Sequence, residues 1–104
     1  MGMDLEPIAP KPEAPRNDDG TVIELHYNWY GWERLCRFLR HHQVDLSEFR
    51  GCNDGDPISE ATCIKVADTI DKFYPELADP PHSTGEDWNE DAICWRTCGG
   101  YKQY

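Results

Sequence analysis

The chain lacks any long hydrophobic run, and no stretch of its 104 residues approaches the roughly 18 apolar residues of a membrane-spanning helix. Its first residues, Met1-Gly2-Met3-Asp4-Leu5, also lack the basic start and apolar centre of a secretory signal peptide. The five cysteines are an odd number, which does not suit a disulfide framework. We therefore expect a cytoplasmic protein with reduced thiols and no membrane partner.

Basic residues are scarce in this sequence. Ten Lys and Arg stand against twenty Asp and Glu, so the net charge at pH 7 is −10. A surface this negative repels the phosphates of nucleic acids, and we expect no direct binding of DNA or RNA. Two interpretations of the charge stay open. It can keep the protein soluble, or it can attract a basic partner protein, including a nucleic-acid-binding groove that the chain would block as a mimic.

Motifs of catalysis are missing as well. The sequence has no phosphate-binding P-loop, no dinucleotide-binding glycine fingerprint and no Gly-x-Ser-x-Gly nucleophile turn. It also lacks the Cys-x-x-Cys pairs of structural zinc sites. These gaps predict no cofactor, no catalytic residue and no metal site, and they favour binding over enzymatic activity.

The most polar turn that the sequence does contain is the bend Asn53-Asp54-Gly55-Asp56. If Asp54 is the first position of an EF-hand calcium loop, the twelfth is Lys65 instead of the required Glu, so that class of site is excluded. A looser divalent-cation site formed by Asn53, Asp54 and Asp56 remains as an alternative hypothesis, and with it a small metal-dependent enzyme. The other interpretation is a simple turn, whose negative charge favours the start of the next helix.

Short patterns typical of strands occur at both ends of the chain. They predict strands over residues 1–8, 21–27 and 101–104, the last one as an edge strand. Pro-rich stretches predict loops over 9–20 and 75–86, because proline lacks the backbone donor that regular elements use. The length of the chain suits a single domain with one modest core.

Three helices are predicted between these strands. The clearest one follows Asn28, whose side chain suits an N-cap. Its apolar stripe consists of Trp29, Trp32, Leu35, Cys36, Leu39 and His42. A second helix runs from the cap Ser59 to about Tyr74, and a third covers 87–98 before Gly99-Gly100 ends it. The predicted fold is therefore α+β, with three helices packed on a small sheet that includes strands from both chain ends.

Two groups of residues are candidates for binding. The first joins aromatic rings to polar side chains, a combination typical of small-molecule pockets, and comprises Asn28, Trp29, Tyr30, Asn53, Asp54, Asp56 and Arg96. Within it, Tyr30 lies off the apolar stripe and is the best candidate for a direct contact. The second is an acidic run around an indole, which suits a basic partner protein, and comprises Glu86, Asp87, Trp88, Glu90 and Asp91.

Four short motifs occur in a fixed order along the chain. They are Met1-Gly2-Met3-Asp4, Asn28-Trp29-Tyr30-Gly31-Trp32, Asn53-Asp54-Gly55-Asp56 and Arg96-Thr97-Cys98-Gly99-Gly100-Tyr101. In this respect the chain resembles a family of small bacterial and phage proteins that has no established activity. It departs from that family in its Pro-rich early loop and in a shortened region before the last helix. The resemblance implies that the terminal strands pair and that the central bend lies near both chain ends.

These observations together predict a non-enzymatic binding protein. From the resemblance, we expect an inhibitor encoded by a phage or mobile element and acting in the cytoplasm of the host cell. It would block a basic partner protein or sequester a small ligand. The alternative is the small metal-dependent enzyme built on the Asn53-Asp54-Gly55-Asp56 bend.

Overall fold

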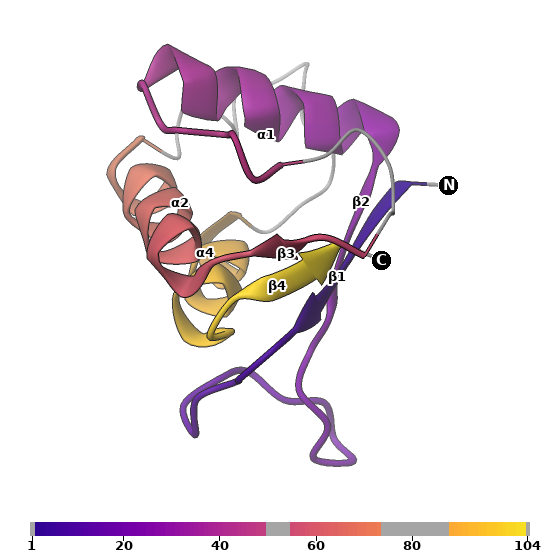
Figure 1. Cartoon of the computed structure of the whole chain (residues 1–104). Coiled ribbons are helices and arrows are strands. Elements are labelled where there is room, and N and C mark those ends of the chain that lie inside the picture. Colours follow the sequence, from indigo (N-terminus) through magenta and orange to yellow (C-terminus); the bar gives the residue numbers. More distant parts are fainter. Residues whose placement is uncertain (1, 50–54, 74–87, 104) are drawn as a thin grey trace.

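Three helices and a four-stranded antiparallel sheet form the fold in the computed structural model, which describes residues 2–49, 55–73 and 88–103 (Figure 1). In chain order the elements are β1 Gly2–Pro7, β2 Leu25–Asn28, α1 Trp29–His41, β3 Pro57–Ile58, α2 Glu60–Phe73, α4 Trp88–Thr97 and β4 Tyr101–Gln103. The predicted α+β class is confirmed, and the sheet does include strands from both ends of the chain.

The strand order is β2-β1-β4-β3, and every neighbouring pair is antiparallel. Leu5 of β1 lies opposite Gln103 of β4. The prediction of β4 as an edge strand is wrong, because the short strand β3 pairs with its other side and places Ile58 opposite Tyr101. No strand was predicted at Pro57 and Ile58, which directly follow the polar bend in the sequence. Pro57 suits the edge position that β3 occupies, since proline cannot donate to a further strand.

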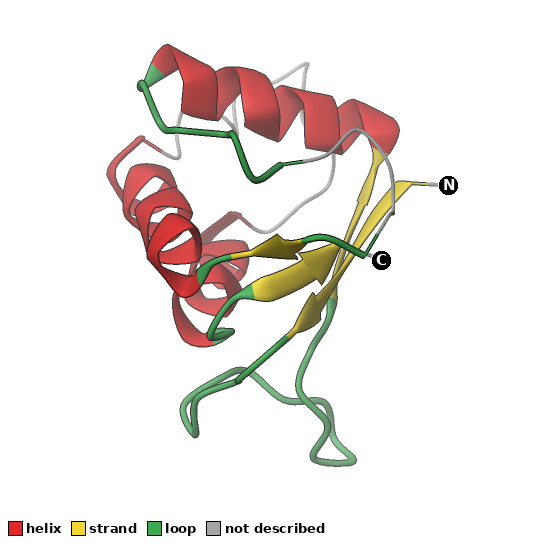
Figure 2. Ribbon diagram, in the orientation of Figure 1, coloured by secondary structure: helices red, strands yellow, loops and turns green. Residues whose placement is uncertain are grey.

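The helices that the structure describes all lie on one face of the sheet (Figure 2). Side chains alternate across each strand, so that the inward residues are buried, while outward residues such as Asp4, His26 and Lys102 are exposed. The buried inward residues are Met3, Leu5, Leu25, Tyr27, Ile58, Tyr101 and Gln103. The helices α2 and α4 pack against each other over this face, and α1 packs next to β1 and β2.

The predicted helix starts are confirmed. The Asn28 side-chain oxygen accepts a hydrogen bond from the Gly31 amide at 2.7 Å, so Asn28 caps α1. Ser59 precedes α2, and its carbonyl accepts the Cys63 amide at 3.0 Å. The predicted strand over 21–27 was too long at its start, because β2 begins only at Leu25.

The Pro-rich loop packs along the end of α4. The amides of Ala9 and Lys11 donate to the carbonyls of Cys98 and Thr97 at 3.1 and 2.8 Å, and Ala14 is buried. Gly99 lies at this contact with a φ of 67°, a left-handed conformation that favours glycine. A Cβ atom there would lie 2.1 Å from the Ala9 carbonyl oxygen. The end of the last helix therefore needs glycine for both conformation and space.

The core is rich in aromatic rings, and one hydroxyl links two of its elements. Tyr27 of β2 stacks on Trp88 of α4, with ring centroids 5.9 Å apart. Its hydroxyl donates to the Asp91 carboxylate at 2.8 Å and accepts from the Trp95 indole nitrogen at 3.2 Å. All four side chains are buried. A buried carboxylate is tolerated only where hydrogen bonds replace its hydration, so Tyr27 and Asp91 depend on each other.

The first prediction concerns Gly99. Gly99→Ala should lower the free energy of unfolding more than the matched substitution Gly20→Ala. Both glycines have positive φ, so each substitution should cost about 1–2 kcal/mol in backbone strain. A Cβ at Gly20 meets nothing within 4 Å, whereas the overlap at Gly99 should add about 1–3 kcal/mol. Urea denaturation of both variants measures the difference, and equal losses would show that the loop does not pack on the end of α4.

The second prediction concerns Tyr27. Tyr27→Phe removes a hydrogen-bond donor from buried Asp91 and should cost about 1–3 kcal/mol of unfolding free energy. Burial, and then the charge of Asp91, raises the pKa of Tyr27 well above its ordinary value. The stability supplied by the protonated phenol is therefore complete below about pH 10 and is lost as the pH rises further.

In Tyr27→Phe, the alkaline fall of the free energy of unfolding should be shallower by about 1.4 kcal/mol per pH unit, which is the contribution of one proton. The control is Tyr30→Phe, because the Tyr30 ring is 60% exposed. It should leave the stability at neutral pH unchanged, because no buried hydrogen bond is lost. An unchanged slope in Tyr27→Phe would contradict the buried hydrogen bond.

Candidate functional site

A pocket of about 280 Å³ lies between α1 and the connector that follows it. Its lining residues are Trp29, Trp32, Glu33, Cys36, Arg40, Leu46 and Phe49, and we call it the Trp29 pocket. The helical residues recur at intervals of three or four, so they share one side of α1. The connector forms another side of the pocket, because Leu46 and Phe49 pack partly buried against the core.

Two tryptophan rings form walls of the pocket. The wall formed by Trp32 is fixed, because that ring is buried in the core, and the wall formed by Trp29 is open, because that ring is partly exposed to solvent. The Trp32 ring is 5% exposed and stacks on Phe49, with centroids 5.0 Å apart and planes 15° apart. The Trp32 ring also packs against the Tyr27 ring in a tilted arrangement, with ring centroids 6.0 Å apart. Trp29 is 36% exposed at the start of the helix. A flat ligand could therefore bury the open indole against a wall that the core already holds in place.

Charged groups reach the pocket from two positions on α1. Arg40 is exposed, and among the described residues no carboxylate lies within ion-pair distance of its guanidinium. Glu33 is engaged differently, because its carboxylate accepts a hydrogen bond from Arg37 at 2.7 Å. Arg40 is therefore the cation of this pocket that is available to an anionic ligand.

The thiol in the pocket, that of Cys36, is not activated as a nucleophile. Burial raises the pKa of Cys36 to about 11, although the positive charge of Arg40 partly opposes this shift. The thiolate is the nucleophilic form of cysteine, and a pKa this high leaves little of it at neutral pH. The Cys36 thiol is therefore not poised for nucleophilic attack.

Three residues of the first predicted group separate in the structure. Asn28 uses its side-chain oxygen to cap α1, Trp29 lines the Trp29 pocket, and Tyr30 lies on another side of α1, where it lines a second pocket. Asp56 precedes β3, and its carbonyl accepts the amide of Gln103 at 3.0 Å. Asn53 and Asp54 lie outside the described residues. The structure thus places one residue of this group, Trp29, in the Trp29 pocket.

Arg96 does not join these residues. Its two terminal nitrogens contact Asp68 and Asp71 of α2, each at 2.7 Å. These hydrogen bonds raise the pKa of Arg96, with Asp68 contributing most. Arg96 therefore holds α4 against α2 and is not directed to the Trp29 pocket.

The second predicted group is divided between core and surface. Trp88 is 4% exposed and stacks on Tyr27, and Asp91 is 6% exposed and binds the same tyrosine. The expectation that these two side chains face a partner is therefore corrected: they belong to the core. Glu90 is exposed, and Glu86 and Asp87 lie outside the described residues.

The structure shows no gathered metal ligands among the residues that it describes. In those parts of the chain, no three His, Cys, Asp or Glu side chains come together as a possible cation site. The hypothesis of a divalent-cation site at the bend concerns Asn53 and Asp54, which lie outside those parts. It stays a prediction.

Arg40 and Phe49 are site residues that the sequence analysis missed. Arg40 had a usable signal, since residues 29, 33, 36 and 40 recur at helical spacing along one side of the same helix. Phe49 had none, because its place against Trp32 depends on how the connector folds back over α1.

Comparisons with protein-family models, with curated proteins and with solved structures found no match for this chain. Among the described helices, none is long and apolar enough to cross a membrane.

The third prediction tests the two walls of the pocket. Trp32→Ala should cost about 3–5 kcal/mol of unfolding free energy, because it empties a buried site. Trp29→Ala should cost much less, since its ring is already open to solvent. Thermal and urea unfolding of both variants measure the contrast. Similar losses would mean that Trp29 is a core residue, and the pocket would then have no open wall.

Proposed function

We propose that this protein is a non-enzymatic binding protein that sequesters a small, flat, anionic ligand in the Trp29 pocket. The observation that carries the proposal is the meeting of an exposed indole, a fixed aromatic wall and an available guanidinium around one hollow of about 280 Å³. Small-molecule sites have this composition, with mostly apolar walls and a few directed polar groups. The modest volume favours a compact ligand.

A flat ligand is favoured by the aromatic walls. The Trp32 ring is held by Phe49 on one side and by the core behind it, so it loses little freedom when a ligand binds. A planar ring that enters next to Trp29 would gain stacking as well as burial of apolar surface.

An anionic group on the ligand is favoured by Arg40. A guanidinium binds a carboxylate or phosphate through two parallel hydrogen bonds, which gives both strength and orientation. The net charge of −10 opposes large polyanions more than a ligand with one compact charge. Ring and anion together define the ligand class as an aromatic carboxylate or a mononucleotide-like phosphate.

Sequestration fits the described residues better than the blocking of a basic partner through the acidic run. That mode needed Trp88 at the surface, and Trp88 is in the core. The resemblance to phage proteins indicates what purpose the binding would serve. Within the proposal, the protein acts as an inhibitor in a bacterial host by withdrawing the ligand from the system that uses it.

The fourth prediction tests this proposal. Titration with a panel of aromatic carboxylates and nucleoside monophosphates, followed by indole fluorescence and calorimetry, should reveal a ligand. Trp29→Ala should weaken its binding about tenfold through lost stacking and burial. Arg40→Gln should weaken anionic ligands about tenfold but leave their uncharged analogues unaffected, because only the charged hydrogen bonds are lost.

The matched control is Arg37→Gln, which removes the same charge one turn away and outside the Trp29 pocket. It should leave the affinity nearly unchanged. Native mass spectrometry of the protein from its natural host should also show a retained species of low mass. The proposal fails if no compound of the panel binds and the mass spectra show no retained species. It also fails if Arg37→Gln and Arg40→Gln lower the affinity for an anionic ligand equally.

A further inference from the structure

A small hollow lies beneath the Pro-rich loop, where this loop packs on the end of α4. Residues of the loop cover the hollow, and the end of α4 and the strand β4 form its floor. The cover is Ala14, Pro15, Val22 and Ile23, and the floor includes Cys94, Cys98 and Tyr101. In this closed arrangement the hollow is too small for a water molecule, unlike the two hollows beside α1.

The hydroxyl of Tyr101 is the unusual group at this hollow. The ring is completely buried and packs edge-on against Trp95, with ring centroids 4.9 Å apart. Among the described residues, its hydroxyl has no hydrogen-bond partner. Burial, and then the neighbouring thiols of Cys98 and Cys94, raises the pKa of Tyr101 well above its ordinary value, so the phenol remains a donor at neutral pH. A buried donor without a partner is costly and rare, so this hydroxyl is available to an acceptor that enters the hollow.

The other polar side chains around the hollow are neutral or already bonded. The Thr97 hydroxyl and the Cys98 thiol donate to helix carbonyls at 2.7 and 3.4 Å. Burial, and then the charges of Asp91 and Glu90, raises the pKa of Cys94 to about 12. Negative charge therefore already acts on this hollow, and none of the described residues that line it is charged. A neutral ligand suits such a site better than an anion or a cation.

The cover of the hollow is a self-contained unit of the chain. The hydrogen bonds that the structure describes for residues 14–23 stay within the loop, and among them the Ile23 amide donates to the Pro15 carbonyl at 3.1 Å. The bonds to the end of α4 come from residues 9 and 11, before the cover begins. Figure 1 shows the loop between β1 and β2 extending past the end of the sheet. The cover can therefore move as a unit without breaking a hydrogen bond to α4.

We propose that this hollow is a second ligand site, closed by residues 14–23 as a lid, and that it takes a small neutral compound with an apolar body and one acceptor oxygen. The acceptor receives the hydrogen bond of the Tyr101 hydroxyl when the lid opens. The apolar body packs between Cys94 and the underside of the lid, where Ala14 is buried in the closed form. The ligand shifts the population toward the opened lid, because only that arrangement has room for it. A ketone is the simplest compound of this class.

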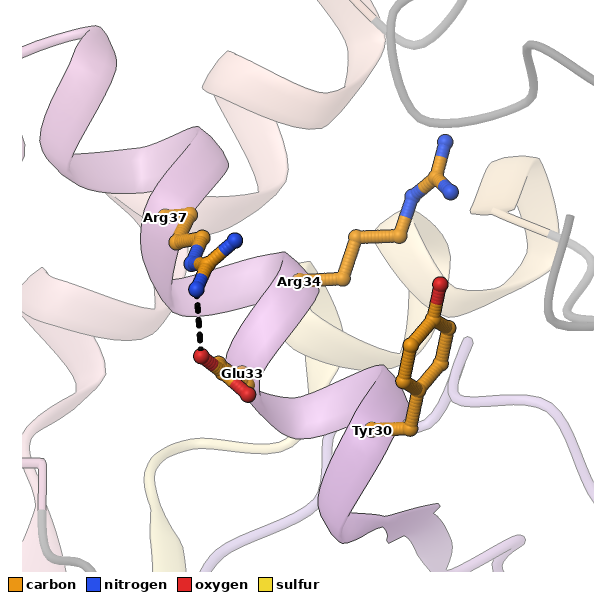
Figure 3. A pocket seen from close by; sticks show the side chains of 4 residues that line it. All are labelled: Tyr30, Glu33, Arg34 and Arg37. Atoms are coloured by element: carbon orange, nitrogen blue, oxygen red, sulfur yellow. Dashed lines mark hydrogen bonds and ion pairs between the residues drawn. The ribbon is translucent and has the colours of Figure 1, made fainter. Parts of the chain in front are cut away.

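This site does not rest on the ligand proposed for the Trp29 pocket. Trp29 and Arg40 line that pocket, and neither lines the hollow at Tyr101. The two sites can therefore fail separately. A third hollow lies on the solvent side of α1 and contains the Tyr30 ring, which Figure 3 shows extending away from the helix. Tyr30 thus supplies an exposed phenol for comparison with the buried one.

The fifth prediction compares two neutral probes of similar shape, acetophenone and α-methylstyrene, in which a methylene group replaces the carbonyl oxygen. NMR titration of the isotope-labelled full chain should show saturable binding of acetophenone, with shifts at the amides of Ala14, Ile23 and Cys94. α-Methylstyrene should bind about tenfold more weakly, because the Tyr101 hydroxyl then finds no acceptor.

Tyr101→Phe should lower the affinity for acetophenone about tenfold and leave that for α-methylstyrene unchanged. Because the hydroxyl has no partner among the described residues of the free protein, this substitution should not lower the urea midpoint of unfolding. The matched control is Tyr30→Phe, which removes a phenol from a ring that is 60% exposed. It should leave the affinities for both probes unchanged.

Four results would overturn the proposal. Acetophenone that does not bind saturably would show that the lid does not open for such a compound, and equal affinities of the two probes would show that Tyr101 donates no hydrogen bond to a ligand. Weaker binding of acetophenone in Trp29→Ala would place the probe in the Trp29 pocket. A lower urea midpoint in Tyr101→Phe would show that the hydroxyl already has a partner. The comparison of the two probes uses the unaltered chain, so it decides the question even if Tyr101→Phe does not fold.

Discussion

The hydroxyl group of Tyr27 is the polar contact on which the arrangement of the other elements depends. It binds Asp91 and Trp95 of α4 inside an otherwise apolar core. A buried carboxylate and a buried phenol are stable only while they satisfy each other, which fixes β2 against α4 in one register. The next residue after Tyr27 is Asn28, the cap of α1. The buried contact therefore lies directly before the residue that caps α1.

The last strand has a similar organising effect from the other end of the chain. Gln103 of β4 is completely buried, and its side-chain amide donates to the carbonyls of Glu48 and Asp56 at 2.9 and 3.1 Å. These bonds hold the connector that carries Phe49, and Phe49 is the residue that supports Trp32 in the Trp29 pocket. The last strand of the chain thus holds in place a pocket wall that comes from the middle of the sequence. This is why an inner position for β4 matters for the site.

Local patterns predicted most of the elements, because apolar stripes, caps and glycines act over a few residues. They did not predict β3, since two residues show no periodicity and its partner in β4 lies more than forty residues away. The acidic run was placed at the surface for an equally local reason, as charged residues are rarely buried. Asp91 is buried because Tyr27, 64 residues earlier, supplies a donor. What the sequence concealed was in each case a contact between distant segments.

The two sides of α1 meet at Glu33, which lines both hollows. Its carboxylate is bound to Arg37 and lies in the pocket that also contains Arg40. The side chains of Arg37 and Glu33 are 75% and 60% exposed, so solvent screens this ion pair strongly. Arg40 therefore stays the positive charge that a ligand of the proposed kind would meet, whether or not Arg37 holds Glu33.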